Sequence, residues 1–205
     1  MDLIAYALPF LVVLILSLSF HEAAHAWSAD KLGDPTARLL GRLTLNPLAH
    51  IDWIGTVLFP LLAAISNLPL IGWAKPVPVN PVNLQHPRRD FAMVAAAGPA
   101  SNLLLALVGV VPLALLSTGE VTGSLLLDFL RGFIQLNVFL AVFNLLPVPP
   151  LDGGNILAGL VPEPVARVID QSRPFGIFIL YGLILTGLLG EIVRPVQGFL
   201  VRWLP

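Results

Sequence analysis

Residues 3–27 read LIAYALPFLVVLILSLSFHEAAHAW, and this stretch decides the class of fold. The part from Leu3 to Phe20 carries no charge and approaches the roughly 20 apolar residues that a helix needs to cross a bilayer. Two histidines and a glutamate follow at its end, in HEAAH from His21 to His25. An ionisable side chain inside a membrane helix costs roughly 2.5–3.5 kcal/mol on insertion scales, so three together indicate a functional site.

The composition of the whole chain also indicates a membrane protein. Of its 205 residues, 57% are hydrophobic and only 11% are charged, against roughly a quarter in soluble domains. The mean hydropathy is +0.87. A net charge of −1 argues against nucleic-acid binding, which needs a basic face. The chain has no cysteine, so any zinc must be held by His, Asp or Glu.

Further apolar runs set the expected architecture. Three more are long enough to span a bilayer, at Phe91–Leu116, Leu125–Leu146 and Phe175–Ile192. The run Ile54–Trp73 contains two prolines and is expected to be re-entrant or interfacial, and the tail Val196–Leu204 is expected at the membrane interface. Residues 1–205 are therefore predicted to form a single all-α polytopic membrane domain. It should have about four to six transmembrane helices, a re-entrant or interfacial segment and a short extended Pro-rich hairpin.

Charge placement predicts the orientation. The segment between the first span and Phe91 carries many basic residues, whereas the loop Ser117–Ser124 holds Glu120 and no basic residue. The basic residues are Lys31, Arg38, Arg42, Lys75, Arg88 and Arg89. By the positive-inside rule the basic segment is cytoplasmic. We therefore expect a multi-pass protein of the cell (plasma or inner) membrane, with HEAAH toward the cytoplasmic side.

HEAAH is typical of a zinc site on a helix. His21 and His25 are four residues apart and share one helix face, so both imidazoles can bind one metal ion. Glu22 projects about 100° around the helix and can act as a general base on water. The alternative is that HEAAH is only the polar end of a helix.

A hydrolytic zinc site needs a third protein ligand, and Asp152 is the best candidate. It lies in PPLDGG, after the fourth apolar run, where prolines break the helix and expose an acid at membrane depth. HEAAH and Asp152 lie on the same side of the membrane only if an odd number of spans separates the first apolar run from the fourth. This requires that Ile54–Trp73 does not cross the membrane. The alternative is that Asp152 only caps the next helix.

An ordered set of motifs between His21 and Asn155 resembles the site-2 protease family of intramembrane metalloproteases. The set comprises HEAAH, GRLTLNPLAHID, GWAKPVPVNP, AAAGPASN and NLLPVPPLDGG. The lack of an inserted PDZ or CBS domain is similar to short members of that family. The resemblance implies an HExxH-type zinc metalloendopeptidase that cleaves transmembrane protein substrates within the bilayer, in regulated intramembrane proteolysis.

The resemblance also implies roles for individual residues. His21, His25 and Asp152 would hold one Zn²⁺ per chain, and Glu22 would be the general base. Asn144, eight residues before Asp152, would face the site and hold the peptide carbonyl or the developing oxyanion. A helix–helix hydrogen bond is the alternative for Asn144.

Three other features carry separate expectations. Asn102 is expected to serve helix packing among small residues, and His50 is expected to be a loop residue bonded to backbone. The stretch KPVPVNPVN from Lys75 to Asn83 alternates in the manner of an extended strand. It is hypothesised to pair edge-on with an unwound substrate, with a rigid Pro-rich turn as the alternative.

Competing functions remain at this stage. A metal transporter or channel would place its ligands along a path through the membrane, often with repeat symmetry, and no repeat is visible. A catalytically inactive member would only bind partners. A protease with a glutamate as zinc ligand is disfavoured by the positions of the glutamates. Nothing in the residues selects a physiological substrate or an oligomeric state.

Overall fold

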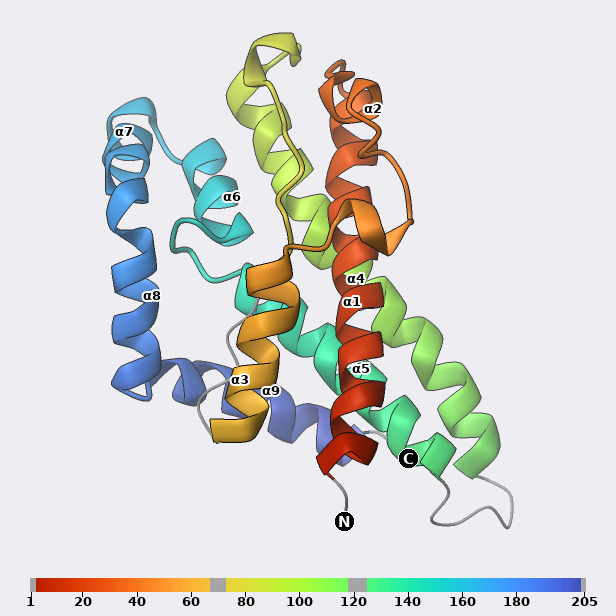
Figure 1. Cartoon of the computed structure of the whole chain (residues 1–205). Helices are drawn as coiled ribbons and strands as arrows, with labels where there is room; N and C mark the ends of the chain where they lie inside the picture. Colours follow the sequence, from red (N-terminus) through yellow and green to blue (C-terminus); the bar gives the residue numbers. More distant parts are fainter. Residues whose placement is uncertain (1–2, 67–72, 118–124, 204–205) are drawn as a thin grey trace.

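The computed structural model describes residues 3–66, 73–117 and 125–203, and every regular element in those ranges is helical (Figure 1). The α-helices are α1 Leu3–Lys31, α2 Thr36–Leu39, α3 Phe59–Ser66, α4 Pro87–Ser117, α5 Leu125–Asn144, α6 Asp152–Leu160, α7 Glu163–Ser172, α8 Gly176–Leu185 and α9 Leu188–Trp203. A π-helical turn, Trp53–Leu58, precedes α3. The prediction of an all-α protein is confirmed.

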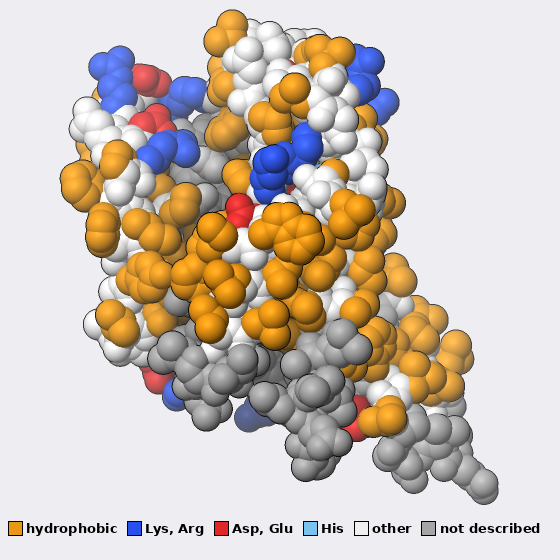
Figure 2. Space-filling view, viewed as in Figure 1, with side chains coloured by type: hydrophobic (Ala, Val, Ile, Leu, Met, Phe, Trp, Pro, Cys, Tyr) orange, Lys and Arg blue, Asp and Glu red, His pale blue; other side chains and the backbone are white. Residues whose placement is uncertain are grey.

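Within the described ranges, four helical segments are long and apolar enough to cross a membrane. They are Pro9–Lys31, Pro87–Ser117, Leu125–Asn144 and Glu163–Leu185. A broad belt of apolar side chains covers the middle of the molecule in the space-filling view (Figure 2). Such a surface is suited to lipid tails rather than to water.

Helix α4 is the centre of the bundle and contacts α1, α5 and α6 (Figure 1). Ala106 and Leu113 of α4 pack with Ile134 of α5 in one buried cluster. A β-carbon at Gly109 would meet Ile134 and Phe133, so the small residue lets the two backbones approach closely. Because α4 touches α1 and α6 together, it brings HEAAH and Asp152 to the same region.

The run Ile54–Trp73 turns back on itself. The backbone N–H of Trp73 donates to the carbonyl of Gly55 at 3.2 Å, and the Thr56 hydroxyl donates to the carbonyl of Trp73 at 2.8 Å. Both ends of the run therefore lie together, while residues 67–72 are outside the described residues. This agrees with the expectation of a re-entrant or interfacial segment, because a run whose ends lie together adds no full crossing before α4.

The Pro-rich stretch is extended, but the predicted hairpin is wrong for the described residues. Residues 73–80 form a single extended segment that leads into a 3₁₀ turn at Pro81–Asn83, with no paired strand. Prolines at 76 and 78 lack the N–H that a ladder needs, which explains this outcome. We call residues 76–79 the extended segment.

Asp34, just after α1, anchors the chain that follows the extended segment. Its buried carboxylate accepts hydrogen bonds from the backbone N–H of Asn80 at 2.6 Å and from the Asn83 amide at 2.8 Å. It also accepts from the backbone and the hydroxyl of Thr36. The extended segment is thus fixed relative to the C-terminal end of α1.

The prediction of one span at Phe175–Ile192 is wrong. Helix α8 ends at Leu185, Gly187 has a φ of 75°, and α9 starts at Leu188. Glycine reaches this left-handed conformation without steric cost, so it ends the helix. Figure 1 shows α9, which includes most of the expected interfacial tail, running across the end of the bundle away from α8. The apolar candidate span is instead Glu163–Leu185.

Basic residues gather at one end of the bundle. Arg38 lies on α2, Arg88 near the start of α4 and Arg167 on α7, and Figure 1 shows these three elements at the same end. In Figure 2 most visible Lys and Arg side chains lie above the apolar belt. That this end faces the cytoplasm stays a prediction.

Candidate metal centre

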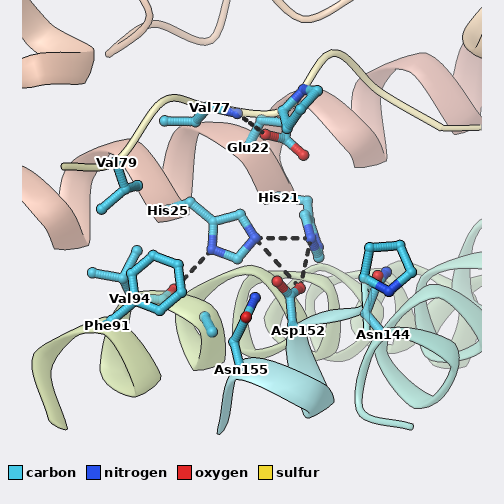
Figure 3. Close-up of a pocket in the computed structure, with 13 residues that line it drawn as sticks. His21, Glu22, His25, Val77, Val79, Phe91, Val94, Asn144, Asp152 and Asn155 are labelled. Carbon is cyan, nitrogen blue, oxygen red and sulfur yellow. Dashed lines mark hydrogen bonds and ion pairs between the residues drawn. The ribbon is translucent and has the colours of Figure 1, made fainter. Parts of the chain in front are cut away.

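His21 and His25 lie next to each other on α1. Their side chains are buried, and their Nε2 atoms are 3.0 Å apart. Residues four apart on a helix share a face, so HEAAH aims both rings at the same space. Figure 3 shows both imidazoles directed toward Asp152, between α1 and the start of α6.

The opposite ring nitrogens bind helix α4. Nδ1 of His21 is 2.6 Å from Oδ1 of Asn102, and Nδ1 of His25 is 2.7 Å from the backbone carbonyl of Val94. A backbone carbonyl only accepts hydrogen bonds, so the His25 ring must carry a proton on Nδ1. Its Nε2 then offers a lone pair to the cavity in the neutral form, which is the state of a metal ligand.

Asp152 is brought to the histidine pair by the start of α6. Its Oδ2 is 3.1 Å from Nε2 of His21 and 3.4 Å from Nε2 of His25. The N-cap of α6 is Leu151, and no side chain caps the helix there. Asp152 therefore points into the site rather than toward its own helix backbone.

Two glycines let the chain reach this position. A β-carbon at Gly153 would collide with the carbonyls of Leu145 and Leu146, and one at Gly154 would meet Pro149. The turn after α5 therefore packs directly against the first turn of α6. This close approach explains why glycines follow the aspartate in LDGG.

The residues fit a zinc ion. Oδ2 of Asp152 is buried and has no hydrogen-bond partner among the described residues, although an unpaired buried oxygen is costly. Two imidazoles and one carboxylate form a donor set of catalytic zinc sites. Gly98 of α4 leaves room for both rings, because a β-carbon there would collide with them.

Glu22 is also close, since one ligand atom of each of His21, Glu22 and His25 lies within 4.8 Å of the others. However, Oε2 of Glu22 accepts a hydrogen bond from the backbone N–H of Val77 at 2.8 Å. Figure 3 shows Glu22 beside the extended segment, away from Asp152. This position suits a base next to the centre better than a third ligand.

The centre opens into a cavity of about 310 Å³. Its walls include the three candidate ligands, Glu22, Val77 and Val79 of the extended segment, and Phe91. Asn144 also lines it, and its amide donates to the carbonyl of Leu140 at 2.9 Å within α5 (Figure 3). This hydrogen bond of Asn144 lies within its own helix, so it does not support the helix–helix alternative.

Two other residues can be placed. His50 is buried in the loop before the re-entrant segment, where Nε2 is 2.8 Å from the carbonyl of Thr44, in agreement with the expected loop role. Asn102 was interpreted as a packing residue, and the sequence analysis missed its contact with His21. The available signal was a polar amide inside an apolar run, although it lies 81 residues from His21 in the sequence.

Comparisons with known proteins identify the family of the chain. The family model described as Peptidase family M50 matches residues 109–187, which include Asp152 but not HEAAH. "Putative zinc metalloprotease YwhC" of Bacillus subtilis is 41% identical over 201 residues, which are 92% of this chain and 86% of the relative. "Putative zinc metalloprotease Rip2" of Mycolicibacterium smegmatis is 32% identical over 191 residues, 89% and 70% of the two chains.

A helical membrane bundle with a buried His, His and Asp cluster is the architecture expected for an intramembrane metalloprotease family. The chain belongs to that family, peptidase family M50, the site-2 proteases. The resemblance inferred from the motifs is confirmed. No solved structure matches the chain.

Proposed function

We propose that this protein is an intramembrane zinc endopeptidase that hydrolyses peptide bonds of transmembrane proteins. One observation carries the proposal. Nε2 of His21 and Nε2 of His25 both lie within 3.4 Å of the same Asp152 oxygen, which is buried and accepts no described hydrogen bond. Three ligand atoms thus converge on one point inside an apolar bundle, with Glu22 beside them.

His21, His25 and Asp152 would hold the zinc. When bound, zinc supplies positive charge that lowers the pKa of water toward about 7 and polarises a carbonyl oxygen. Glu22 takes the proton of the attacking water, whose oxygen forms a bond to the peptide carbon. Glu22 then gives the proton to the leaving amide nitrogen as the carbon–nitrogen bond breaks. Asn144 lines the cavity and uses one amide N–H for the carbonyl of Leu140, so its second N–H would donate to the developing oxyanion.

The extended segment is proposed to hold the substrate. A transmembrane helix closes its own peptide hydrogen bonds, so the scissile region must unwind before hydrolysis. Residues 76–79 are extended, and Pro76, Val77 and Val79 line the cavity. Pairing of an unwound substrate with the backbone carbonyls of this segment and the N–H of Val79 would replace part of its lost hydrogen bonds and lay it across the centre.

The geometry favours hydrolysis over metal transport. A transporter is expected to distribute its ligands along a path, whereas the three candidate ligands here meet at one depth. A general base within the same cluster has no purpose in simple transport. We place the enzyme in a cell membrane with the centre toward the cytoplasmic side, supported by the basic residues at that end of the bundle.

The test uses purified wild type, Glu22→Gln and Asp152→Asn, with zinc content and cleavage of a transmembrane substrate measured on each. Wild type should hold one zinc per chain and cleave. Glu22→Gln should keep the zinc and lose cleavage, since it lacks the base, and Asp152→Asn should bind zinc more weakly.

Glu191→Gln is a matched control, because Glu191 is an exposed residue paired with Arg194 on α9, at the end of the bundle opposite to α2 and α7 (Figure 1). It should resemble wild type in both measurements. Cleavage by Glu22→Gln at the wild-type rate would rule out the proposed mechanism.

A further inference from the structure

We propose that Asn102 is a positioning residue of the metal centre. Together with Asn137 it forms a hydrogen-bond chain that fixes the proton of His21 on Nδ1 and holds Nε2 ready for the metal. This inference rests on the proposed zinc site. It goes beyond that site because it assigns a function to two asparagines that are not among the candidate zinc ligands.

The chain of contacts joins three helices. Asn102 of α4 and Asn137 of α5 are both fully buried. Oδ1 of Asn102 is 2.6 Å from Nδ1 of His21, and its amide nitrogen donates to Oδ1 of Asn137 at 3.0 Å. The amide nitrogen of Asn137 donates in turn to the backbone carbonyl of Phe133 at 2.9 Å.

The donor-to-acceptor direction of this hydrogen-bond chain is determined by its last acceptor, the carbonyl of Phe133. The carbonyl of Phe133 can only accept, so Asn137 must present its amide nitrogen there and its Oδ1 toward Asn102. Asn102 must then present its nitrogen to Asn137, an orientation that also suits the carbonyl of Ser17 at 3.4 Å. Its oxygen is left for His21, whose Nδ1 must therefore be the donor.

The proton of His25 is also held on Nδ1, but by the backbone carbonyl of Val94 instead of an asparagine. Val94, Gly98 and Asn102 follow one another at intervals of four residues and form one face of α4. This face supplies an acceptor to each imidazole and, at Gly98, the space for both rings. The two histidines of α1 are thus oriented by α4, on the side opposite to the metal.

A simpler role for the asparagines is to stabilise the association of the helices, which we call adhesion. Buried amides do join membrane helices, and the bond between Asn102 and Asn137 joins α4 and α5. Adhesion alone does not require that the free oxygen of Asn102 sits 2.6 Å from a ring nitrogen of His21. The two roles differ in their consequences, because only a positioning role changes zinc affinity and the ring proton.

The experiment measures zinc affinity of the full-length purified protein by competition with a chelator. Removal of a partner of a metal-binding histidine typically weakens metal affinity or activity by about 10–100-fold, and we expect a loss in this range for Asn102→Leu. Asn102→Asp keeps a carbonyl oxygen opposite His21 and should retain most of the affinity. Asn137→Leu leaves the amide nitrogen of Asn102 with only its longer bond to the carbonyl of Ser17, and its zinc affinity should fall between those of the other two variants.

A second measurement reads the ring proton itself. In protein loaded with Co²⁺, the Nδ1 protons of both histidines should give two shifted, solvent-exchangeable proton signals by nuclear magnetic resonance. In Asn102→Leu the signal of His21 should exchange faster with water or disappear, while that of His25 persists. Ser101→Ala is the matched control, since Ser101 is the neighbouring residue and its hydroxyl donates only to the carbonyl of Gly98.

The outcomes separate this inference from the proposed function. If wild type binds no zinc, the proposed function itself fails. If wild type binds zinc and Asn102→Leu binds it equally tightly with both proton signals intact, only the role of Asn102 is refuted. A loss of thermal stability at unchanged zinc affinity would likewise refute it and leave adhesion. If Asn102→Leu does not fold, Asn102→Ser is judged by the same criteria.

Discussion

The backbone N–H of Val77 donates a hydrogen bond of 2.8 Å to the carboxylate of Glu22. The contact joins the proposed base on α1 to the extended segment, which lies 55 residues further along the chain. Glu22 is buried, so this bond stabilises a carboxylate that is largely shielded from water and would otherwise lack this partner. The same segment that is proposed to bind substrate therefore also orients the base.

Val77→Pro tests that contact, because it removes the N–H donor from a segment that is already extended and rich in proline. A hydrogen bond to a charged group contributes about 1.5–3 kcal/mol, so cleavage should fall by roughly 10–100-fold. Zinc content should not change. Val77→Ala keeps the N–H and serves as control. Equal activity of the two variants would show that the bond does not matter for catalysis.

Asp34→Asn tests the anchor of the extended segment. The substitution removes the charge from a buried carboxylate that accepts bonds from Thr36, Asn80 and Asn83. Hydrogen exchange at Val77 and Asn80 should accelerate and cleavage should fall, with zinc retained. Asp30→Asn removes only a pair with Arg38 at the surface, which typically contributes about 0–1 kcal/mol. The anchor has no functional role if both variants behave alike.

The same anchor predicts a pH dependence. Burial alone raises the pKa of Asp34, but the hydrogen bonds from Thr36, Asn83 and Asn80 outweigh it, and the pKa lies below its ordinary value of 3.8. A pKa lowered by folding adds stability above the unfolded pKa, and that stability is lost as the pH falls through the folded pKa. The protection factor of the Asn80 amide against exchange should therefore fall below pH 3.8 in wild type. In Asp34→Asn this protection factor should be low already at neutral pH.

Gly98→Ala tests the packing of the imidazoles against α4. The added methyl group would collide with the rings of His21 and His25 and displace them, so zinc affinity should fall by about tenfold or more. Gly132→Ala on α5 is the matched control, since a β-carbon there meets nothing within 4 Å. Alanine is about 0.5–1 kcal/mol more favourable than glycine inside a helix, so helix propensity cannot explain a loss. Equal zinc affinity of both variants would contradict the account.

The orientation can be read with single cysteines, because the chain contains none of its own. Leu39, 75% exposed after the first span, should be reached by a membrane-impermeant thiol reagent only from the cytoplasmic side as Leu39→Cys. Leu125→Cys, at an 86% exposed position at the other end, should react from outside. Labelling with the sides exchanged would invert the proposed orientation.

Local patterns predicted much of this structure. HEAAH at the end of an apolar run placed two imidazoles on one face of α1, because helix periodicity alone determines that arrangement. The prolines within Ile54–Trp73 indicated that this run does not simply cross. Asp152 was selected because an acid after broken backbone at membrane depth needs a partner, and it does lie beside both histidines.

Features that depend on tertiary contacts were not predictable in the same way. The role of Asn102 follows from the packing of α4 against α1 and α5, which no local pattern encodes. The left-handed conformation of Gly187 divides an apolar run that looks continuous by composition. The hairpin was expected from alternation in residues 75–83, but alternation does not reveal whether a partner strand exists.

The central claim is that two histidines of α1 and the first residue of α6 hold one zinc ion. X-ray absorption at the zinc edge of the purified protein, with zinc stoichiometry on the same sample, tests it most directly. We expect one zinc per chain, bound by two imidazole nitrogens at about 2.0–2.1 Å and otherwise by oxygen. Zinc without two imidazole ligands, or no bound zinc in active protein, would contradict the claim.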